Sequence, residues 1–128
     1  MASPRLEEIA TLVTWNEVIQ PSSPEYVQET ICFSVQKDLK PQLVIRPSSA
    51  ESLQKPIPRL YEDKDIDFAI RSGGYNSASA KDVLVSMSAF DEVTFDAAKE
   101  TVIVSTGQRW QDLYTKLEAT APGYTGMY

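Results

Sequence analysis

The sequence predicts an α/β (α+β) fold with a small mixed sheet, a parallel βαβ unit, a hairpin and flanking helices. Residues 42–46 and 67–71 are apolar runs with β-branched side chains, and a helical segment separates them. Strand, helix and strand within about 30 residues are typical of a βαβ unit with parallel strands. Residues 83–87 predict a third strand. Residues 93–95 and 101–104 are two further β-like runs around a polar turn, which predicts a hairpin.

The N-terminal segment has the pattern of a short amphipathic helix. Leu6, Ile9 and Val13 recur at helical spacing, after Pro4 at the first helical position. The proline-rich segment 21–24 then interrupts the chain. Residues 26–35 form either a second short helix or an irregular segment, because their apolar pattern fits neither period well.

The segment between the first two strands predicts a broken helix. Ser48 and Glu51 are three residues apart, as in a capping box, so a helix should begin there. Pro56 and Pro58 would each remove a backbone donor and crowd the preceding turn. We therefore expect a break or kink within residues 55–59.

The last predicted helix covers about residues 108–119. Trp110, Leu113, Tyr114 and Leu117 recur there at the spacing of one helix face. We expect these four side chains to belong to the core.

The composition excludes several classes of function. The chain has 128 residues, a length that suits one domain, with 12 Lys plus Arg against 18 Asp plus Glu and a net charge of −6. With no basic cluster, we expect no binding to nucleic acid or to an anionic membrane. With no histidine and one cysteine, Cys32, the chain lacks His-dependent triads, an intrachain disulfide and a His- or Cys-based metal site. We expect Cys32 to be a small buried side chain.

Targeting signals are not evident in the sequence. No apolar run is long enough to cross a bilayer, and residues 1–16 lack the basic region and apolar run of a secretory signal. A cytoplasmic location is the default expectation.

A glycine pair follows the second predicted strand. Gly73 and Gly74 lie among small polar residues, with Arg71 before them and Asn76 after them. Glycines permit close backbone approach, and successive amides can form an anion-binding nest. From composition alone, the pair is either such a nest or an ordinary turn between strands. The chain contains neither G-x-G-x-x-G nor a Walker A motif.

Longer sequence blocks around the glycine pair make its interpretation more specific. The residues from Phe68 to Asn76 resemble an Arg-Ser-Gly-Gly-His loop, and the segment around Trp110 resembles a Trp-x-Asp-Leu-Tyr block. Together they are similar to the FAD-binding domain of berberine-bridge-enzyme-like oxidases, which are flavoproteins of the vanillyl-alcohol-oxidase or p-cresol-methylhydroxylase (PCMH) type. The resemblance runs in five ordered blocks: Pro21–Tyr26, Pro41–Gln54, Phe68–Asn76, Val83–Phe90 and Thr101–Tyr114.

The resemblance implies an FAD-linked oxidoreductase. Such a protein oxidises a small organic substrate by hydride transfer to the flavin, and O₂ then reoxidises the flavin. Many similar fungal proteins act in secondary-metabolite pathways. Because Tyr75 stands where the family usually has its flavin-linking histidine, FAD is expected to bind non-covalently. The cofactor contacts that the resemblance implies are Arg71, Ser72, Gly73, Gly74, Tyr75, Asn76 and Gly107.

The resemblance also suggests how the chain is divided. We expect a helical or irregular extension at residues 1–38 and the first half of a PCMH-type FAD-binding domain at residues 39–128. An alternative is a non-catalytic remnant or interaction module that keeps the fold without tight flavin binding. Its uncovered apolar surface would favour self-association or a partner that supplies the other half of the domain. A third alternative is a module for another phosphorylated ligand, which would keep the glycine nest without redox chemistry.

Overall fold

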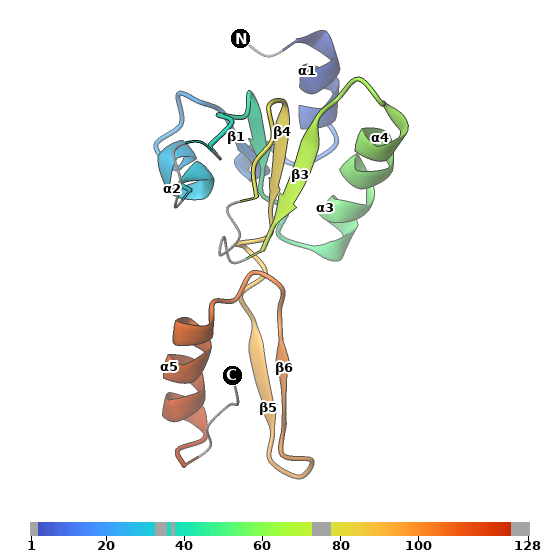
Figure 1. Cartoon of the computed structure of the whole chain (residues 1–128). Helices are drawn as coiled ribbons and strands as arrows, with labels where there is room; N and C mark the ends of the chain where they lie inside the picture. Colours follow the sequence, from blue (N-terminus) through green and yellow to red (C-terminus); the bar gives the residue numbers. More distant parts are fainter. Residues whose placement is uncertain (1–2, 33–35, 37, 73–77, 124–128) are drawn as a thin grey trace.

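The chain forms two units joined by a short link (Figure 1). The structure is a computed structural model, and it describes residues 3–32, 36, 38–72 and 78–123. We call residues 3–86 the sheet unit and residues 93–121 the hairpin unit. The sheet unit contains α1 (Pro4–Ala10), the 3-10 turn η1 (Trp15–Glu17), β1 (Val18–Ile19), α2 (Tyr26–Thr30), β2 (Leu43–Ile45), α3 (Ala50–Gln54), α4 (Pro56–Glu62), β3 (Phe68–Arg71) and β4 (Val83–Ser86). The hairpin unit contains β5 (Val93–Asp96), β6 (Thr101–Val104) and α5 (Trp110–Thr120).

The four-stranded sheet has the order β1-β2-β4-β3. β2 and β3 both run parallel to β4, so the predicted parallel direction is confirmed. They are not neighbours, however, because β4 lies between them. Burial agrees with this strand order. Every residue of β4 is buried, which suits a central strand, whereas Ile70 on β3 is half-exposed at the sheet edge.

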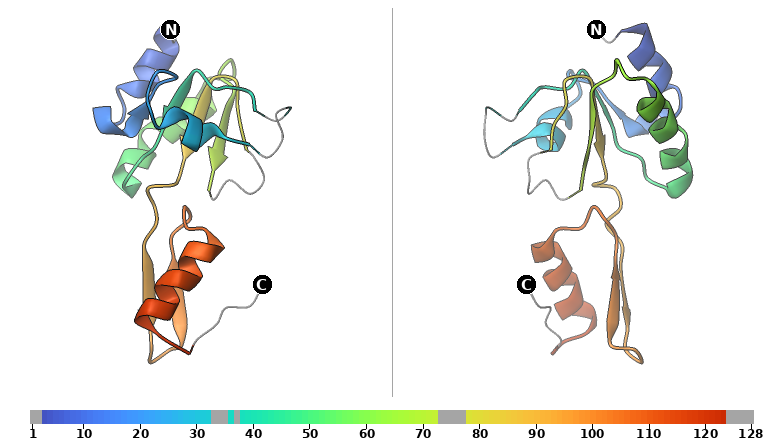
Figure 2. Two further views of the ribbon diagram at one scale, coloured as in Figure 1. Left: turned by 90° about the vertical axis from the view of Figure 1, so that its left-hand side faces the viewer. Right: turned by 45° about the vertical axis from the view of Figure 1, so that its right-hand side comes forward.

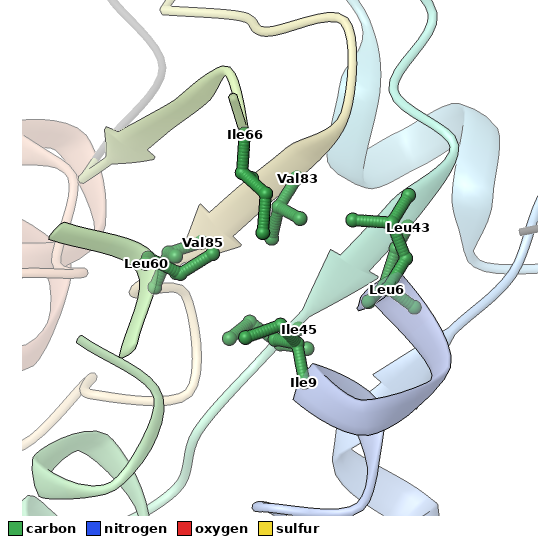
Figure 3. Packing of buried hydrophobic residues seen from close by; sticks show 8 residues of the cluster. All are labelled: Leu6, Ile9, Leu43, Ile45, Leu60, Ile66, Val83 and Val85. Atoms are coloured by element: carbon green, nitrogen blue, oxygen red, sulfur yellow. The ribbon is translucent and has the colours of Figure 1, made fainter. Parts of the chain in front are cut away.

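Helices cover both faces of this sheet (Figure 2). Side chains alternate between faces along each strand, so Leu43 and Ile45 on β2 share one face with Val83 and Val85 on β4. This face packs against α1 and α4 (Figure 3). The buried cluster on it consists of Leu6, Ile9, Leu43, Ile45, Leu60, Ile66, Val83 and Val85.

The opposite face of the sheet carries a smaller core. Ile19, Val44 and Leu84 are buried there, with Tyr26 of α2 packed against them. The hydroxyl of Tyr26 donates a hydrogen bond to the carbonyl oxygen of Pro41 at 2.6 Å, which helps to hold α2 over this face.

The break predicted within residues 55–59 is confirmed, because α3 ends at Gln54 and α4 begins at Pro56. Proline is tolerated in the first turn of a helix, where its missing N–H would have no intrahelical partner. The predicted capping box is wrong by one residue: Ser49 is the N-cap of α3, and its side chain accepts a hydrogen bond from the N–H of Ser52. Ser48 instead donates from its N–H and its hydroxyl to the carboxylate of Glu17.

Residues before position 39 take part in the same sheet and core. β1 pairs antiparallel with β2, in a register that aligns Val18 with Ile45. Leu6 and Ile9 of α1 belong to the larger buried cluster. The division at residue 38 stays a prediction, and the sheet unit draws its core from both sides of it.

The hairpin unit confirms the predicted hairpin and the last helix. β5 and β6 pair antiparallel from Val93 opposite Val104 to Asp96 opposite Thr101. Leu113 and Leu117 of α5 are buried as predicted, but Trp110 is 63% exposed, so its placement in the core is wrong. Trp110 is the first residue of α5, and its ring lies 6.0 Å from that of Tyr114. Among the described residues, no helix is long and apolar enough to cross a bilayer.

Candidate cofactor site

The predicted glycine loop leaves the sheet at the carboxyl ends of its three parallel strands. Arg71 is the last residue of β3, Ser86 is the last residue of β4, and Arg46 follows β2 directly. In open parallel sheets, ligands bind outside this edge. Ser72, the first residue of the loop, is exposed. The predicted contacts at positions 73–76 (Gly73, Gly74, Tyr75 and Asn76) lie outside the described residues.

Arg71 is only 5% exposed, and its guanidinium binds the C-terminal end of α2. Nη1 donates to the carbonyl oxygen of Glu29 at 2.6 Å, and Nη2 donates to that of Ile31 at 2.9 Å. These carbonyls lie where a helix runs out of its own N–H partners, so the guanidinium caps α2. Nε of Arg71 has no hydrogen-bond acceptor among the described residues. Arg71 thus places a buried cation at the end of β3, directly before Ser72.

Glu29 connects α2 to the same edge of the sheet through its carboxylate. Oε1 accepts from Nη1 of Arg46 at 2.9 Å and from the hydroxyl of Ser88 at 2.8 Å. Oε2 accepts from the hydroxyl of Ser86 at 2.6 Å. Burial by itself would raise the pKa of Glu29, but the hydrogen bonds from Ser86, Ser88 and Arg46, with the charge of Arg46, lower it below its ordinary value. The side chain is therefore a buried carboxylate.

A cleft of about 500 Å³ lies beside this network, between α2 and α5. Arg109 and Lys116 bring cations to it, whereas Glu29, Asp91 and Asp112 bring carboxylates. The hydroxyl and amide side chains of the cleft offer neutral hydrogen-bond partners to a polar ligand. The cleft is lined by Gln28, Glu29, Ser88, Asp91, Gly107, Gln108, Arg109, Asp112, Thr115 and Lys116.

Gly107 lies on this cleft, at the joint between the two units. Its N–H donates to the carbonyl oxygen of Phe90 at 2.9 Å. A Cβ at this position would overlap the backbone carbonyl of Met87 and lie 2.8 Å from the carbonyl oxygen of Phe90. Close packing therefore accounts for glycine here, and the predicted contact with the cofactor stays a prediction.

Lys116 fastens α5 to the link at the same joint. Its ammonium donates to the carbonyl oxygen of Asp91 at 2.6 Å and to Oε1 of Gln108 at 2.8 Å. One wall of the cleft is thus held by hydrogen bonds to the link as well as by the packing of α5.

Two residues of the site could not be found from the sequence. Glu29 lies outside every sequence block that carries the resemblance, and Ser88 lies within one of them without a predicted role; they come together over 59 positions of chain. Cys32, expected to be a small buried side chain, is half-buried in a polar setting: its Sγ accepts from Nη2 of Arg71 at 3.2 Å and donates to the carbonyl oxygen of Thr30 at 3.4 Å.

Known fungal proteins resemble much of this chain. An FAD-dependent monooxygenase, yanF, from Aspergillus niger is 30% identical over 116 residues, which is 84% of this chain and 20% of that protein. The FAD-dependent monooxygenase macF from Penicillium terrestre is 29% identical over 110 residues, 80% of this chain and 21% of that protein. The chain thus spans about a fifth of the length of these relatives.

Solved structures share the fold at lower identity. Wild-type BBE-like 1 from Physcomitrella patens matches with a TM-score of 0.70 at 20% identity, over 89% of this chain and 26% of that one. Wild-type Phl p 4.0202, a glucose dehydrogenase, matches with a TM-score of 0.70 at 17% identity, over 94% of this chain and 27% of that one. These matches confirm the predicted α/β fold as that of part of a berberine-bridge-enzyme-like FAD-binding domain.

The family itself is shown by the sequence. The profile of the FAD binding domain family matches residues 41–125, which covers β2 through α5 and includes the glycine loop and Gly107. FAD is therefore the cofactor to which this fold is suited, as the resemblance implied. The chain belongs to the FAD binding domain family.

Proposed function

We propose that this chain is the FAD-binding part of an oxidoreductase that oxidises a small organic substrate. The observation that carries the proposal is the end of β3: Arg71 and Ser72, which precede the glycine pair, lie at the carboxyl edge of a parallel sheet in a chain of the FAD binding domain family. The two fungal relatives named as FAD-dependent monooxygenases support redox chemistry. A secondary metabolite is the substrate class that we propose.

The chain's own residues would bind and orient the cofactor. Bound FAD supplies the hydride acceptor of the reaction. Backbone amides of residues 72–76 would hold the diphosphate, as in other anion-binding nests. Arg71 would supply the cationic base of the loop, and Gly107 would border the same cleft from the hairpin unit. FAD would bind non-covalently, because no histidine is present for a histidyl linkage.

A non-catalytic interaction module is the second candidate function. Ile103 on β6 is 70% exposed, and Val104 beside it is 41% exposed. Among the described residues β6 pairs only with β5, so its other edge carries backbone groups without a partner strand. Apolar side chains along an open edge favour self-association or a partner that covers the hairpin unit.

FAD titration of the purified chain tests the first function. Flavin fluorescence and calorimetry measure the binding, and we expect it to be saturable with a micromolar Kd. Gly73→Val should abolish binding, because a side chain would block close approach of the backbone to the cofactor. The matched control is Ala97→Val in the exposed turn between β5 and β6, which should bind as the wild type does. Absence of binding by the wild type at near-millimolar FAD would contradict the proposal and favour the interaction module.

A further inference from the structure

Glu29 links α2 to all three parallel strands at the edge from which the glycine loop leaves. We propose that Glu29 is a positioning residue for this loop, acting through Arg71 and Ser86; this role rests on the proposed FAD function. The residue lies in a helix of five residues, and a helix so short is not stable without tertiary contacts. The side chain of Glu29 is buried although it is charged, so its hydrogen bonds hold α2 at this edge of the sheet, together with the packing and the hydroxyl of Tyr26.

The two polar ends of Glu29 act on different strands. Its carboxylate accepts from Arg46 after β2, from Ser86 at the end of β4 and from Ser88 beyond it. Its backbone carbonyl accepts from Arg71 at the end of β3. One residue therefore fixes α2 against the ends of β2, β4 and β3 together.

The loop begins at the next residue along β3. Arg71 lies opposite Ser86 in the β3–β4 register, and the N–H of Met87 donates to the carbonyl oxygen of Arg71 at 2.9 Å. Glu29 thus binds both residues of the last pair before Ser72. A shift of α2 would move the carbonyls that hold the Arg71 guanidinium, and with them the start of the loop. Small displacements of groups that hold a ligand lower its affinity strongly.

The charge of Glu29 and its positioning role predict opposite changes in FAD affinity when Glu29 is replaced. Removing its negative charge leaves the Arg46 and Arg71 cations at the carboxyl ends of β2 and β3, and this change by itself would strengthen the attraction for an anionic diphosphate at that edge. Removing its hydrogen bonds would displace Arg71 and Ser72, at the end of β3, and so weaken binding. The sign of the change in FAD affinity therefore separates the two effects.

The experiment is FAD titration of the full chain carrying Glu29→Gln, at a temperature where circular dichroism shows it folded. We expect the Kd to rise about tenfold. Glu25→Gln is the matched control, because it removes the same charge from an exposed position next to the same helix. Its Kd should equal that of the wild type or fall slightly.

A second variant tests the same role without a change of charge. Ser86→Ala removes the 2.6 Å hydrogen bond to Oε2 of Glu29 and leaves the Arg46 and Ser88 contacts, so we expect the Kd to rise about threefold. Ser86→Ala also tests the positioning role if Glu29→Gln does not fold. Wild-type affinity in the folded Glu29→Gln variant, or in Ser86→Ala, would overturn the positioning role alone. Failure of the wild type to bind FAD would overturn the proposed function, and the role of Glu29 with it.

Discussion

The sheet unit and the hairpin unit differ most in how much of each is buried. In the sheet unit, all residues of β2 and β4 are buried between helices on two faces. In the hairpin unit, no residue of β5 or β6 is buried, and the buried side chains belong to α5 and its C-terminal end. A two-stranded hairpin is marginally stable by itself. The sheet unit is therefore stabilised by its own core, whereas the hairpin unit depends on α5 and on its joint to the link.

Polar side chains show the same difference. The buried charged residues of the described chain, Glu17, Glu29 and Arg71, all lie in the sheet unit. The hairpin unit instead presents charged side chains such as Arg109 and Lys116 to the cleft. One unit thus holds the carboxyl ends of its parallel strands with buried hydrogen bonds, and the other contributes one wall of the cleft.

The largest expected effect is the loss of core packing in the sheet unit. Leu84→Ala should lower the free energy of unfolding by about 4 kcal/mol, because it leaves a cavity in a fully buried central strand. Leu113→Ala in the hairpin unit should cost about 2 kcal/mol, since a thinly covered site can relax. Urea denaturation followed by circular dichroism measures both. Equal losses in the two variants would show that the units form one equally packed core.

The next largest loss of stability is expected at the joint between the units. Gly107→Ala places a methyl group on the backbone carbonyl of Met87, so we expect a loss of about 3 kcal/mol and faster amide exchange throughout α5. Gly123→Ala is the control: its Cβ meets nothing within 4 Å, and only its φ of 95° opposes alanine, which should cost about 1 kcal/mol. Unchanged exchange in α5 of Gly107→Ala would contradict the dependence of the hairpin unit on this joint.

The smallest effect concerns pH and belongs to the sheet unit. Burial by itself would raise the pKa of Glu17, but hydrogen bonds from the backbone and hydroxyl groups of Thr14 and Ser48 lower it from 4.5 to about 2. Between these values the unfolded chain binds more protons than the folded chain. Stability from Glu17 is thus complete above about pH 4.5 and is lost progressively as the pH falls towards 2.

Glu17→Gln tests this assignment by pH titration of stability. The variant should lose the share of Glu17 in the decline that the wild type shows below about pH 4.5, while the share of Glu29 remains; Glu7→Gln, at an exposed glutamate in α1, should keep the whole decline. An identical acid profile in the wild type and Glu17→Gln would show that other carboxylates set the acid limit of the sheet unit.

Much of the secondary structure could be predicted because its causes are local. The apolar runs at 42–46 and 83–87, the hairpin and α5 follow from side-chain periodicity, and Pro56 ends one helix and begins the next through its own ring. β1 was not predicted, because two residues are too few to show a period. Trp110 has the spacing of a core residue, but it is the first residue of α5, and its ring is exposed there.

The sequence by itself determined the strands β2 to β6, including the hairpin, the place of the glycine pair after β3 and, through resemblance, the FAD-binding family. The strands and the hairpin depend on residues within a few positions of one another, and the family resemblance depends on the order of motifs along the chain. Only the tertiary structure decided that β4 lies between β2 and β3, and that Glu29 meets Arg46, Ser86 and Ser88. The physical reason is distance along the chain: these partners are 17, 57 and 59 positions from Glu29, and only packing of the sheet brings them within hydrogen-bond reach.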